Sequence, residues 1–290
     1  MKLVRIGQAG FETPGVLIGD DTFVDLSSVV GDFNEAFFHS GALATLESLV
    51  ADRVAAGQVE SVAGRRFGAP IARPHQILCI GLNYSDHAAE TGQAVPPEPI
   101  LFTKSPNTLI GPNDDVQIPR GSTKTDWEVE LGIVIGRHSL YLADETEAAA
   151  SIAGYLLVND VSERAWQIER KGQWTKGKSA PTFNPAGPYL VTPDEVGDVL
   201  ALDLTLDIDG VRRQTGSTST MVFSPTFIVH YLSQFLALEP GDLINTGTPP
   251  GVGMGMTPPT FLHGGEIMTL KITRLGSQTQ HVIGDPTTTA

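Results

Sequence analysis

Short strand-like segments recur along the sequence after residue 74 and restrict the folds that this chain can adopt. The apolar runs lie at residues 77–81, 100–103, 129–135, 155–158, 189–191, 202–208, 243–246 and 267–272. Runs of this length are typical of strands, whereas helices are usually longer. The chain carries 31 Gly and 20 Pro without low-complexity tracts, so these residues are expected to form turns and long loops. The sequence therefore predicts an α+β fold that is mostly β.

Two helices are expected among these strands. The first covers residues 145–153, because Asp144 is a suitable N-cap and Glu147 follows three residues later, as in a capping box. The second begins at Ser224-Pro225, an N-cap and first-turn pairing. Its apolar residues fall on one helical face until the turn sequence at 239–241 ends it.

The N-terminal part of the chain predicts a small unit of its own. Strands are expected at residues 2–6, 15–18 and 22–25, followed by a helix over 42–56. Residues 57–74 are rich in Gly, Ala and Arg and lack periodicity, so they resemble a linker. We therefore expect a small N-terminal α+β domain (residues 1–70) and a larger catalytic domain (71–290).

The charge balance excludes some partners and restricts others. The 19 basic and 33 acidic residues give 19 − 33 = −14, which disfavours binding to nucleic acid. A small carboxylate substrate would need a local cation, supplied by a metal or by buried lysines. The single cysteine, Cys79, excludes an internal disulfide. No signal peptide or membrane-spanning run is apparent, so the expected location is the cytoplasm, with no membrane partner.

Three acidic residues form the strongest candidate site. Side chains alternate along a strand, so Glu128 and Glu130 are expected to project from one face. A third carboxylate, Asp160, ends the apolar run 154–160. Carboxylates held close together repel unless a cation lies between them, and an all-oxygen set suits Mg²⁺, Mn²⁺ or Ca²⁺ better than Zn²⁺. The alternative is an exposed, solvated acidic pair, which is common on strands.

A possible general base follows the strand at 77–81. His87 and Glu90 are three residues apart in a helix-compatible segment, which places them on one face. A carboxylate that accepts one imidazole N–H raises the basicity of the other nitrogen, which can then deprotonate water. The alternative is a surface His–Glu pair at the start of a helix. The prolines at 96, 97 and 99 indicate that this segment forms a mobile cover over a site.

Further polar residues could bind an anion. Arg164 and Gln167 follow the third carboxylate at helical spacing and could contact an oxyanion. Lys104 and Lys178 could each hold a developing negative charge, although a single lysine is usually exposed and without such a role. Thr248 ends a strand, where its hydroxyl and nearby N–H groups could bind a carboxylate. The glycines after it do not match a nucleotide-binding motif.

Taken in order, these motifs closely resemble those of the fumarylacetoacetate hydrolase family. The matching pieces are Gly-Leu-Asn-Tyr-x-x-His87-x-x-Glu90, Phe-x-Lys104, Asp-Trp-Glu128-Val-Glu130-Leu, Gly-Tyr-x-x-x-Asn-Asp160-x-x-x-Arg164-x-x-Gln167, Gly-Lys178-Ser and Thr-Gly-Thr248-Pro-x-Gly. No single piece is specific, but the ordered set is. The resemblance implies a mixed β-roll with a small N-terminal domain, assembled as a homodimer.

The same resemblance implies a mechanism. Glu128, Glu130 and Asp160 would hold Mg²⁺ or Mn²⁺, which would bind the 2-oxo acid end of a substrate and stabilise a pyruvate enolate. His87 with Glu90 would deprotonate water, and Lys178 would stabilise the oxyanion. Substrate contacts would come from Lys104, Arg164, Gln167 and Thr248.

The expected activity is hydrolysis of a C–C bond in 2,4-dioxo acids, either acylpyruvates or 2,4-diketo-3-deoxy sugar acids. The same site could serve an oxaloacetate decarboxylase, a 2-oxo acid isomerase or a ureidoglycolate lyase, and the fold alone does not choose among them. A metal-free ligand-binding homologue is the non-enzymatic alternative.

Overall fold

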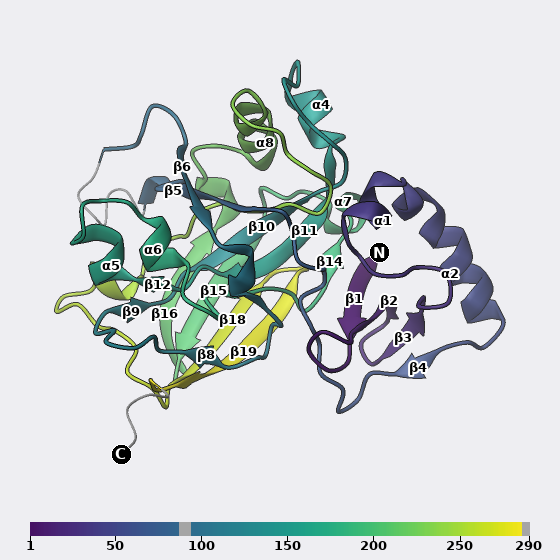
Figure 1. Cartoon of the computed structure of the whole chain (residues 1–290), viewed down its shortest axis with the longest axis horizontal. Coiled ribbons are helices and arrows are strands. Elements are labelled where there is room, and N and C mark those ends of the chain that lie inside the picture. The colour runs from purple at the N-terminus through teal and green to yellow at the C-terminus, as the bar shows by residue number, and fades with distance from the viewer. Residues whose placement is uncertain (87–93, 286–290) are drawn as a thin grey trace.

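The computed structural model describes residues 1–86 and 94–285 and shows a mostly β protein with short helices (Figure 1). The predicted α+β class, mostly β, is confirmed. His87 and Glu90 lie outside the described residues. None of the helices in the described ranges is both long enough and apolar enough to cross a membrane.

A ten-stranded sheet runs through the length of the molecule. From one edge to the other its strands are β4 (Glu60–Ser61), β3 (Thr22–Asp25), β2 (Thr13–Ile18), β1 (Lys2–Ile6), β14 (Leu190–Val191), β11 (Ile152–Asn159), β10 (Val129–Ile135), β17 (Leu243–Asn245), β5 (Ile77–Gly81) and β6 (Ile100–Lys104). The pairings are antiparallel except for β17 with β5, which is parallel.

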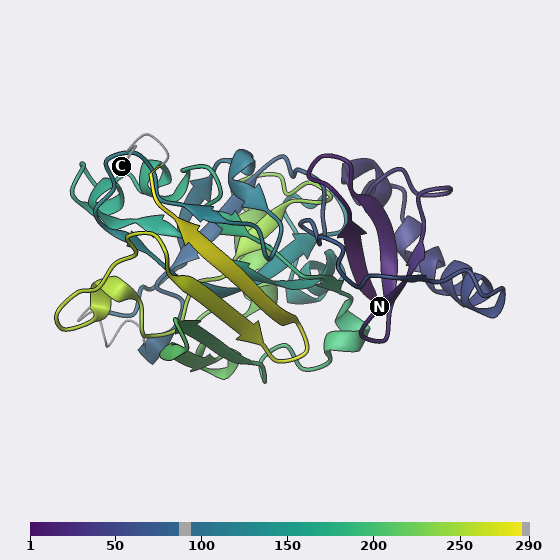
Figure 2. The same cartoon turned by 90° about the horizontal axis from the view of Figure 1, so that it is seen from below.

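A second sheet packs against the middle of the first. Its strands, in order, are β16 (Val211–Ser217), β15 (Asp203–Ile208), β18 (Ile267–Ile272), β19 (Gly276–Ile283) and β8 (Val116–Gln117). The yellow β18–β19 hairpin of this sheet is seen in front in Figure 2. Two further pairs are short: β9 (Thr125–Asp126) with β12 (Ser162–Glu163), and β7 (Leu109–Ile110) with β13 (Asn184–Pro185).

Short helices cover the sheets and connect the strands. They are α1 (Glu35–His39), α2 (Leu46–Ala55), α4 (Glu145–Ala149), α5 (Arg164–Ile168), α6 (Thr175–Lys178), α7 (Pro193–Val196) and α8 (Pro225–Ser233), with single 3₁₀ turns at Ala42–Thr45, Pro106–Thr108, Thr218–Thr220 and Gly253–Gly255.

The core follows the alternation of side chains on β10. Leu131 and Ile133 point into the layer between the two sheets and join one apolar cluster with residues of β15 and β18. Val134 points to the opposite face, where a second cluster contains side chains of β1, β2, α1 and α2. Because β10 is covered on both faces, the continuous apolar run at residues 131–135 is stable there.

Most predicted strands are observed, and the predicted helices are shorter than expected. The Asp144 and Ser224 N-caps form as predicted, each accepting a backbone N–H of its helix. The helix predicted over 145–153 is wrong in its second half, because Ile152 already pairs with β10 as the first residue of β11. The helix predicted over 42–56 begins as a 3₁₀ turn.

The N-terminal strands extend the main sheet at one end of the molecule (Figures 1 and 2). Strand β1 pairs with β2 on one side and with β14 on the other. The segment 57–74 contains β4, and its Gly68 N–H donates to the carbonyl of Arg5 on β1. The domain boundary near residue 70 stays a prediction.

The junction between β11 and β14 depends on a close backbone approach, which gives a testable prediction. A Cβ at Gly154 would lie 2.4 Å from the carbonyl oxygen of Val191, where backbone must move to make room. We expect Gly154→Ala to lower the free energy of unfolding by about 1–3 kcal/mol in urea titrations. Gly31→Ala is the matched control, since nothing lies within 4 Å of its added Cβ and a change within about 0.5 kcal/mol is expected. Equal stabilities of the two variants would contradict this packing.

Candidate functional site

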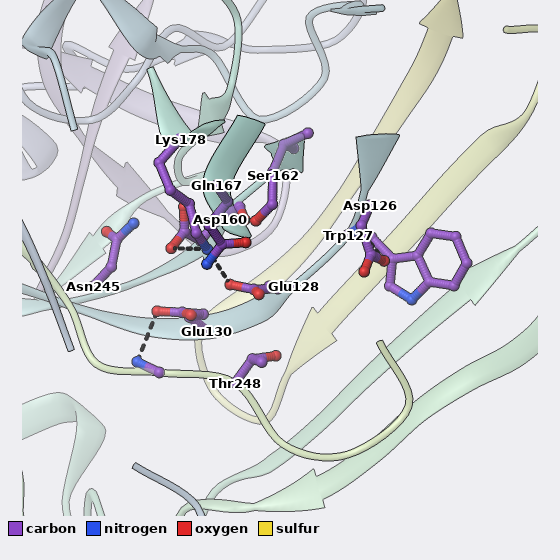
Figure 3. A network of polar contacts seen from close by, with 12 residues as sticks. Asp126, Trp127, Glu128, Glu130, Asp160, Ser162, Gln167, Lys178, Asn245 and Thr248 are labelled. Carbon is purple, nitrogen blue, oxygen red and sulfur yellow. Dashed lines mark hydrogen bonds and ion pairs between the residues drawn. The ribbon is translucent and has the colours of Figure 1, made fainter. Parts of the chain in front are cut away.

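The three predicted carboxylates meet at one point of the main sheet. Antiparallel pairing of β10 with β11 places Asp160 opposite Glu128, and the Asp160 N–H donates to the Glu128 carbonyl at 2.9 Å. One oxygen from each of Glu128, Glu130 and Asp160 lies within 4.8 Å of the others. Their exposures are 6%, 2% and 0%, so the exposed, solvated alternative is wrong. Figure 3 shows the three side chains turned toward one another.

Lys178 bridges two of these carboxylates. Its Nζ lies 2.7 Å from Glu128 Oε2 and 2.9 Å from Asp160 Oδ2, as the dashed lines in Figure 3 mark. The lysine is buried, and burial would lower its pKa, but the two carboxylates outweigh that effect and raise the pKa above its usual value. Lys178 is therefore a fixed positive charge beside the acidic group.

Lys104 holds Asp160 from the other side. Its ammonium pairs with Asp160 Oδ1 and also donates to the backbone carbonyls of Val161 at 3.1 Å and Phe183 at 2.8 Å. An ammonium has three N–H donors, and these three acceptors use them all. In this structure Lys104 therefore orients Asp160.

Arg164 links the acidic group to a residue that sequence analysis did not single out. Its Nε donates to Asp126 at 2.8 Å, its Nη1 donates to Gln167 at 3.0 Å, and its Nη2 forms an ion pair with Glu128 at 2.7 Å. Asp126 is fully buried and two residues before Glu128, so strand alternation could have identified it as a member of the same acidic face.

The environments of the two glutamates differ strongly. Burial alone would raise the pKa of Glu128, but Lys178 and Arg164 outweigh it and lower the pKa to about 2. Burial, together with the charges of Asp160 and Glu128, raises the pKa of Glu130 well above its usual value. The Gly247 N–H donates to Glu130 Oε2 at 2.8 Å and opposes this shift only partly. A positive charge beside Glu130 would relieve the repulsion.

Thr248 is fixed by contacts from both sheets. Its hydroxyl donates to the Val129 carbonyl at 3.0 Å and accepts from Gln214 Nε2 at 2.8 Å. Gln214, on β16, also accepts the Val129 N–H at 2.9 Å. Sequence analysis missed Gln214, because no local pattern shows that this strand of the second sheet reaches the site.

A pocket opens over this arrangement. Of the predicted site residues, it is lined by Glu128, Glu130, Arg164, Gln167, Lys178 and Thr248. Lys104 and Asp160 lie behind this layer and are not among the lining residues of the described chain. The remaining lining residues are Ile80, Gly81, Leu82, Phe102, Ile168, Trp174, Gly247 and Met254. The site thus combines apolar walls with a charged part, here called the ionic floor, which is formed by Glu128, Glu130, Arg164 and Lys178.

Comparisons with known proteins agree with the geometry. The family model described as "Fumarylacetoacetate (FAA) hydrolase C-terminal" matches residues 76–283. A protein from Burkholderia lata that carries a general hydrolase name is 50% identical over 97% of this chain and 98% of its own. A 5-carboxymethyl-2-hydroxymuconate delta-isomerase from Mycobacterium smegmatis superposes with a TM-score of 0.78 and 29% identity, over 98% of this chain and 99% of that one.

A maleylpyruvate hydrolase from Sphingobium sp. SYK-6, solved with manganese(II) and pyruvate, superposes with a TM-score of 0.81 over 98% of this chain and all of that one. Its identity of 24% shows the shared fold alone. The match of the family model over most of the chain and the relative with half of its residues identical lead to one conclusion. The chain belongs to the fumarylacetoacetate hydrolase family.

Proposed function

We propose that this protein is a divalent-metal-dependent hydrolase that cleaves a C–C bond in 2,4-dioxo acids, either acylpyruvates or 2,4-diketo-3-deoxy sugar acids. The observation that carries the proposal is the buried group of Glu128, Glu130 and Asp160, of which the two glutamates line a pocket. Hydrolase chemistry in general is supported by the family and by the hydrolase name of the Burkholderia lata relative.

The three carboxylates fit a hard divalent cation. They offer only oxygen ligands, as Mg²⁺ and Mn²⁺ prefer. Each ionised carboxylate oxygen has about two lone-pair sites, so the contacts with Lys178, Lys104 and Arg164 orient the acids and leave sites for a metal. Burial, and then repulsion from Asp160 and Glu128, raise the pKa of Glu130, and a cation would offset both effects. The manganese of the Sphingobium enzyme is in keeping with this choice of metal.

The local charge also favours a 2-oxo acid. The buried acids Asp126, Glu128, Glu130 and Asp160 face the buried cations Lys104, Lys178 and Arg164, which gives 3 − 4 = −1 when all are ionised. A divalent ion changes this sum to +1, so an anionic substrate would be attracted to a protein whose overall charge is −14.

The roles of the chain's own residues follow from these contacts. The metal, when bound, would supply positive charge that stabilises a pyruvate enolate as a leaving group. Lys178 would hold the oxyanion that forms at the distal carbonyl, and Arg164 and Gln167 would orient the substrate carboxylate. Thr248, which also lines the pocket, would contact the substrate. Lys104 would contribute to substrate binding indirectly, because it orients Asp160. His87 with Glu90 would take the proton from water.

A 2-oxo acid isomerase is the second candidate, and the similarity to the Mycobacterium smegmatis delta-isomerase favours it. Isomerisation needs proton transfers next to a stabilised enolate but no attacking water. The same floor of the pocket therefore suits both reactions, and they differ in whether the base acts on water.

Further expectations concern assembly, location and the arrangement of the chain. We propose that the protein is a cytoplasmic homodimer that binds neither nucleic acid nor membranes. We also propose that residues 71–290 form the family's mixed β-roll and that residues 1–70 form a small N-terminal domain.

An activity panel tests the function directly. With Mg²⁺ or Mn²⁺ present, we expect pyruvate release from one class of 2,4-dioxo acid to exceed decarboxylation of oxaloacetate and isomerisation of 2-oxo dienoates. Removal of the metal with EDTA should abolish turnover, and added metal should restore it, because the enolate is then again stabilised. Turnover that survives EDTA treatment, or an isomerase rate above every hydrolysis rate, would reject the proposal.

The metal site is tested by Glu130→Gln. The amide oxygen can still accept the Gly247 N–H, so the variant should remain folded. Loss of one anionic ligand should weaken Mn²⁺ binding by at least about 100-fold in calorimetric titrations. Glu47→Gln, the same substitution at an exposed residue of α2, is the control and should bind Mn²⁺ as the parent does. Unchanged affinity in Glu130→Gln would exclude Glu130 as a ligand.

The proposed base is tested by His87→Ala. Hydrolysis should fall by about 10²- to 10⁴-fold, because water is no longer deprotonated in place. Mn²⁺ affinity should stay at the parental value in the same calorimetric assay. A joint loss of hydrolysis and metal binding would instead place His87 among the metal ligands.

A further inference from the structure

The walls of the pocket differ sharply from its floor. Leu82, Phe102, Ile168, Trp174 and Met254 line the same pocket as the ionic floor. We propose that these side chains select a 2-oxo acid whose distal end is an uncharged apolar group, an alkyl or aryl chain, over one that ends in a second carboxylate or in hydroxyl groups. This inference rests on the proposed function in one respect, namely that the ionic floor takes the 2-oxo acid end.

The described part of the pocket offers no spare positive charge for a second carboxylate. Its lining cations there are Arg164 and Lys178. Arg164 already lies between Asp126 and Glu128, and Lys178 lies between Glu128 and Asp160. Among the described lining residues, a distal carboxylate would therefore lose its water without gaining an ion pair.

The aromatic part of the wall is closely built. Trp174 packs over Gly81, where an added Cβ would lie 2.7 Å from the indole Cζ3. Its ring meets Phe102 edge to face, with centroids 5.1 Å apart and an interplanar angle of 61°. The Nζ of Lys178 lies 5.1 Å from the centre of the Phe102 ring. Phe102 therefore marks the boundary between the ionic floor and the apolar wall.

The part of the wall that contains Met254 is connected to the floor by Asp126. The N–H groups of Gly253 and Met254 donate to its two carboxylate oxygens at 2.7 and 3.0 Å. Gly253 leaves no room for a side chain, because its Cβ would lie 2.0 Å from the Thr260 carbonyl oxygen. Asp126 also holds Arg164, so one carboxylate fixes both the floor and the backbone that carries Met254. The flexible thioether can adapt to apolar groups of different shapes.

The wall discriminates by desolvation. Each substrate methylene that is buried against the apolar wall should increase the binding affinity by a factor of roughly four. A carboxylate or a row of hydroxyls would have to give up hydrogen bonds to water that these side chains cannot replace. Acylpyruvates with apolar acyl groups therefore fit this pocket better than diketo sugar acids or dioxo dicarboxylates do.

Binding of two matched acids tests the inference without any turnover. The Mn²⁺-loaded full-length protein is titrated calorimetrically with 2-oxooctanoate and with 2-oxooctanedioate, which differ only in the terminal group. Neither has a 4-oxo group, so neither is a substrate for the proposed cleavage. We expect the monoacid to bind at least about 10²-fold more tightly. Equal affinities, tighter binding of the diacid, or no binding of either acid would overturn the inference.

The two proposals can fail separately. If the activity panel shows no C–C cleavage but 2-oxooctanoate still binds more tightly, the proposed hydrolase fails and the apolar preference stands. If acylpyruvates are cleaved but the two acids bind equally, the hydrolase stands and the apolar preference fails.

A charge placed in the wall provides the matched variant. Ile168 ends α5 and its residue is 47% exposed, so it tolerates a long polar side chain. Ile168→Lys should reduce the preference for 2-oxooctanoate over 2-oxooctanedioate by about tenfold, because the ammonium can pair with the distal carboxylate. Ile168→Met keeps the apolar character and should keep the parental preference. An unchanged preference in Ile168→Lys would show that the wall does not contact the distal group.

Discussion

The buried charge balance around Glu128, Glu130 and Asp160 is the interaction on which the rest of the site depends. Isolated ionised groups are too costly to bury, so four acids in this region require partners. Lys104, Lys178 and Arg164 supply them, and each contacts at least one acid. The remaining imbalance is concentrated on Glu130, whose pKa is raised. The same deficit of positive charge that disfavours ionised Glu130 would be relieved by the divalent cation proposed for this group.

This balance is possible only because strand pairing determines where each charge lies. The register of β10 and β11 sets Asp160 opposite Glu128, and the short β9–β12 pair brings Asp126 and Ser162 together. Lys104 comes from the edge strand β6, and Lys178 comes from the end of α6. Segments distant in sequence thus converge on one face, and a slip of one residue in β10 would turn both glutamates into the apolar layer between the sheets.

Much of this could be predicted from the sequence, and what was missed has identifiable causes. Strand β10 was predicted with its observed bounds because an uninterrupted apolar run, residues 131–135, makes up most of it. The acidic pair was found from alternation alone. Strand β19 was missed because Gln278 and Gln280, polar residues, occupy its buried positions, where they bond to backbone carbonyls. Gln214 was missed because a contact between two sheets leaves no local pattern.

The floor and the walls of the pocket are held by different kinds of structure, and this has a consequence for specificity. Glu128, Asp160, Arg164 and Lys178 are linked by ion pairs, so removal of one of these charges leaves a buried partner unpaired and costs about 3–5 kcal/mol. Wall residues such as Ile168 and Leu82 come from a helix end and a turn, and they make no ion pair among the described contacts. Substitutions there alter the shape and polarity of the distal site at little cost in stability. A single ionic floor can therefore serve different distal groups, with the choice of substrate set by side chains that the fold does not otherwise require.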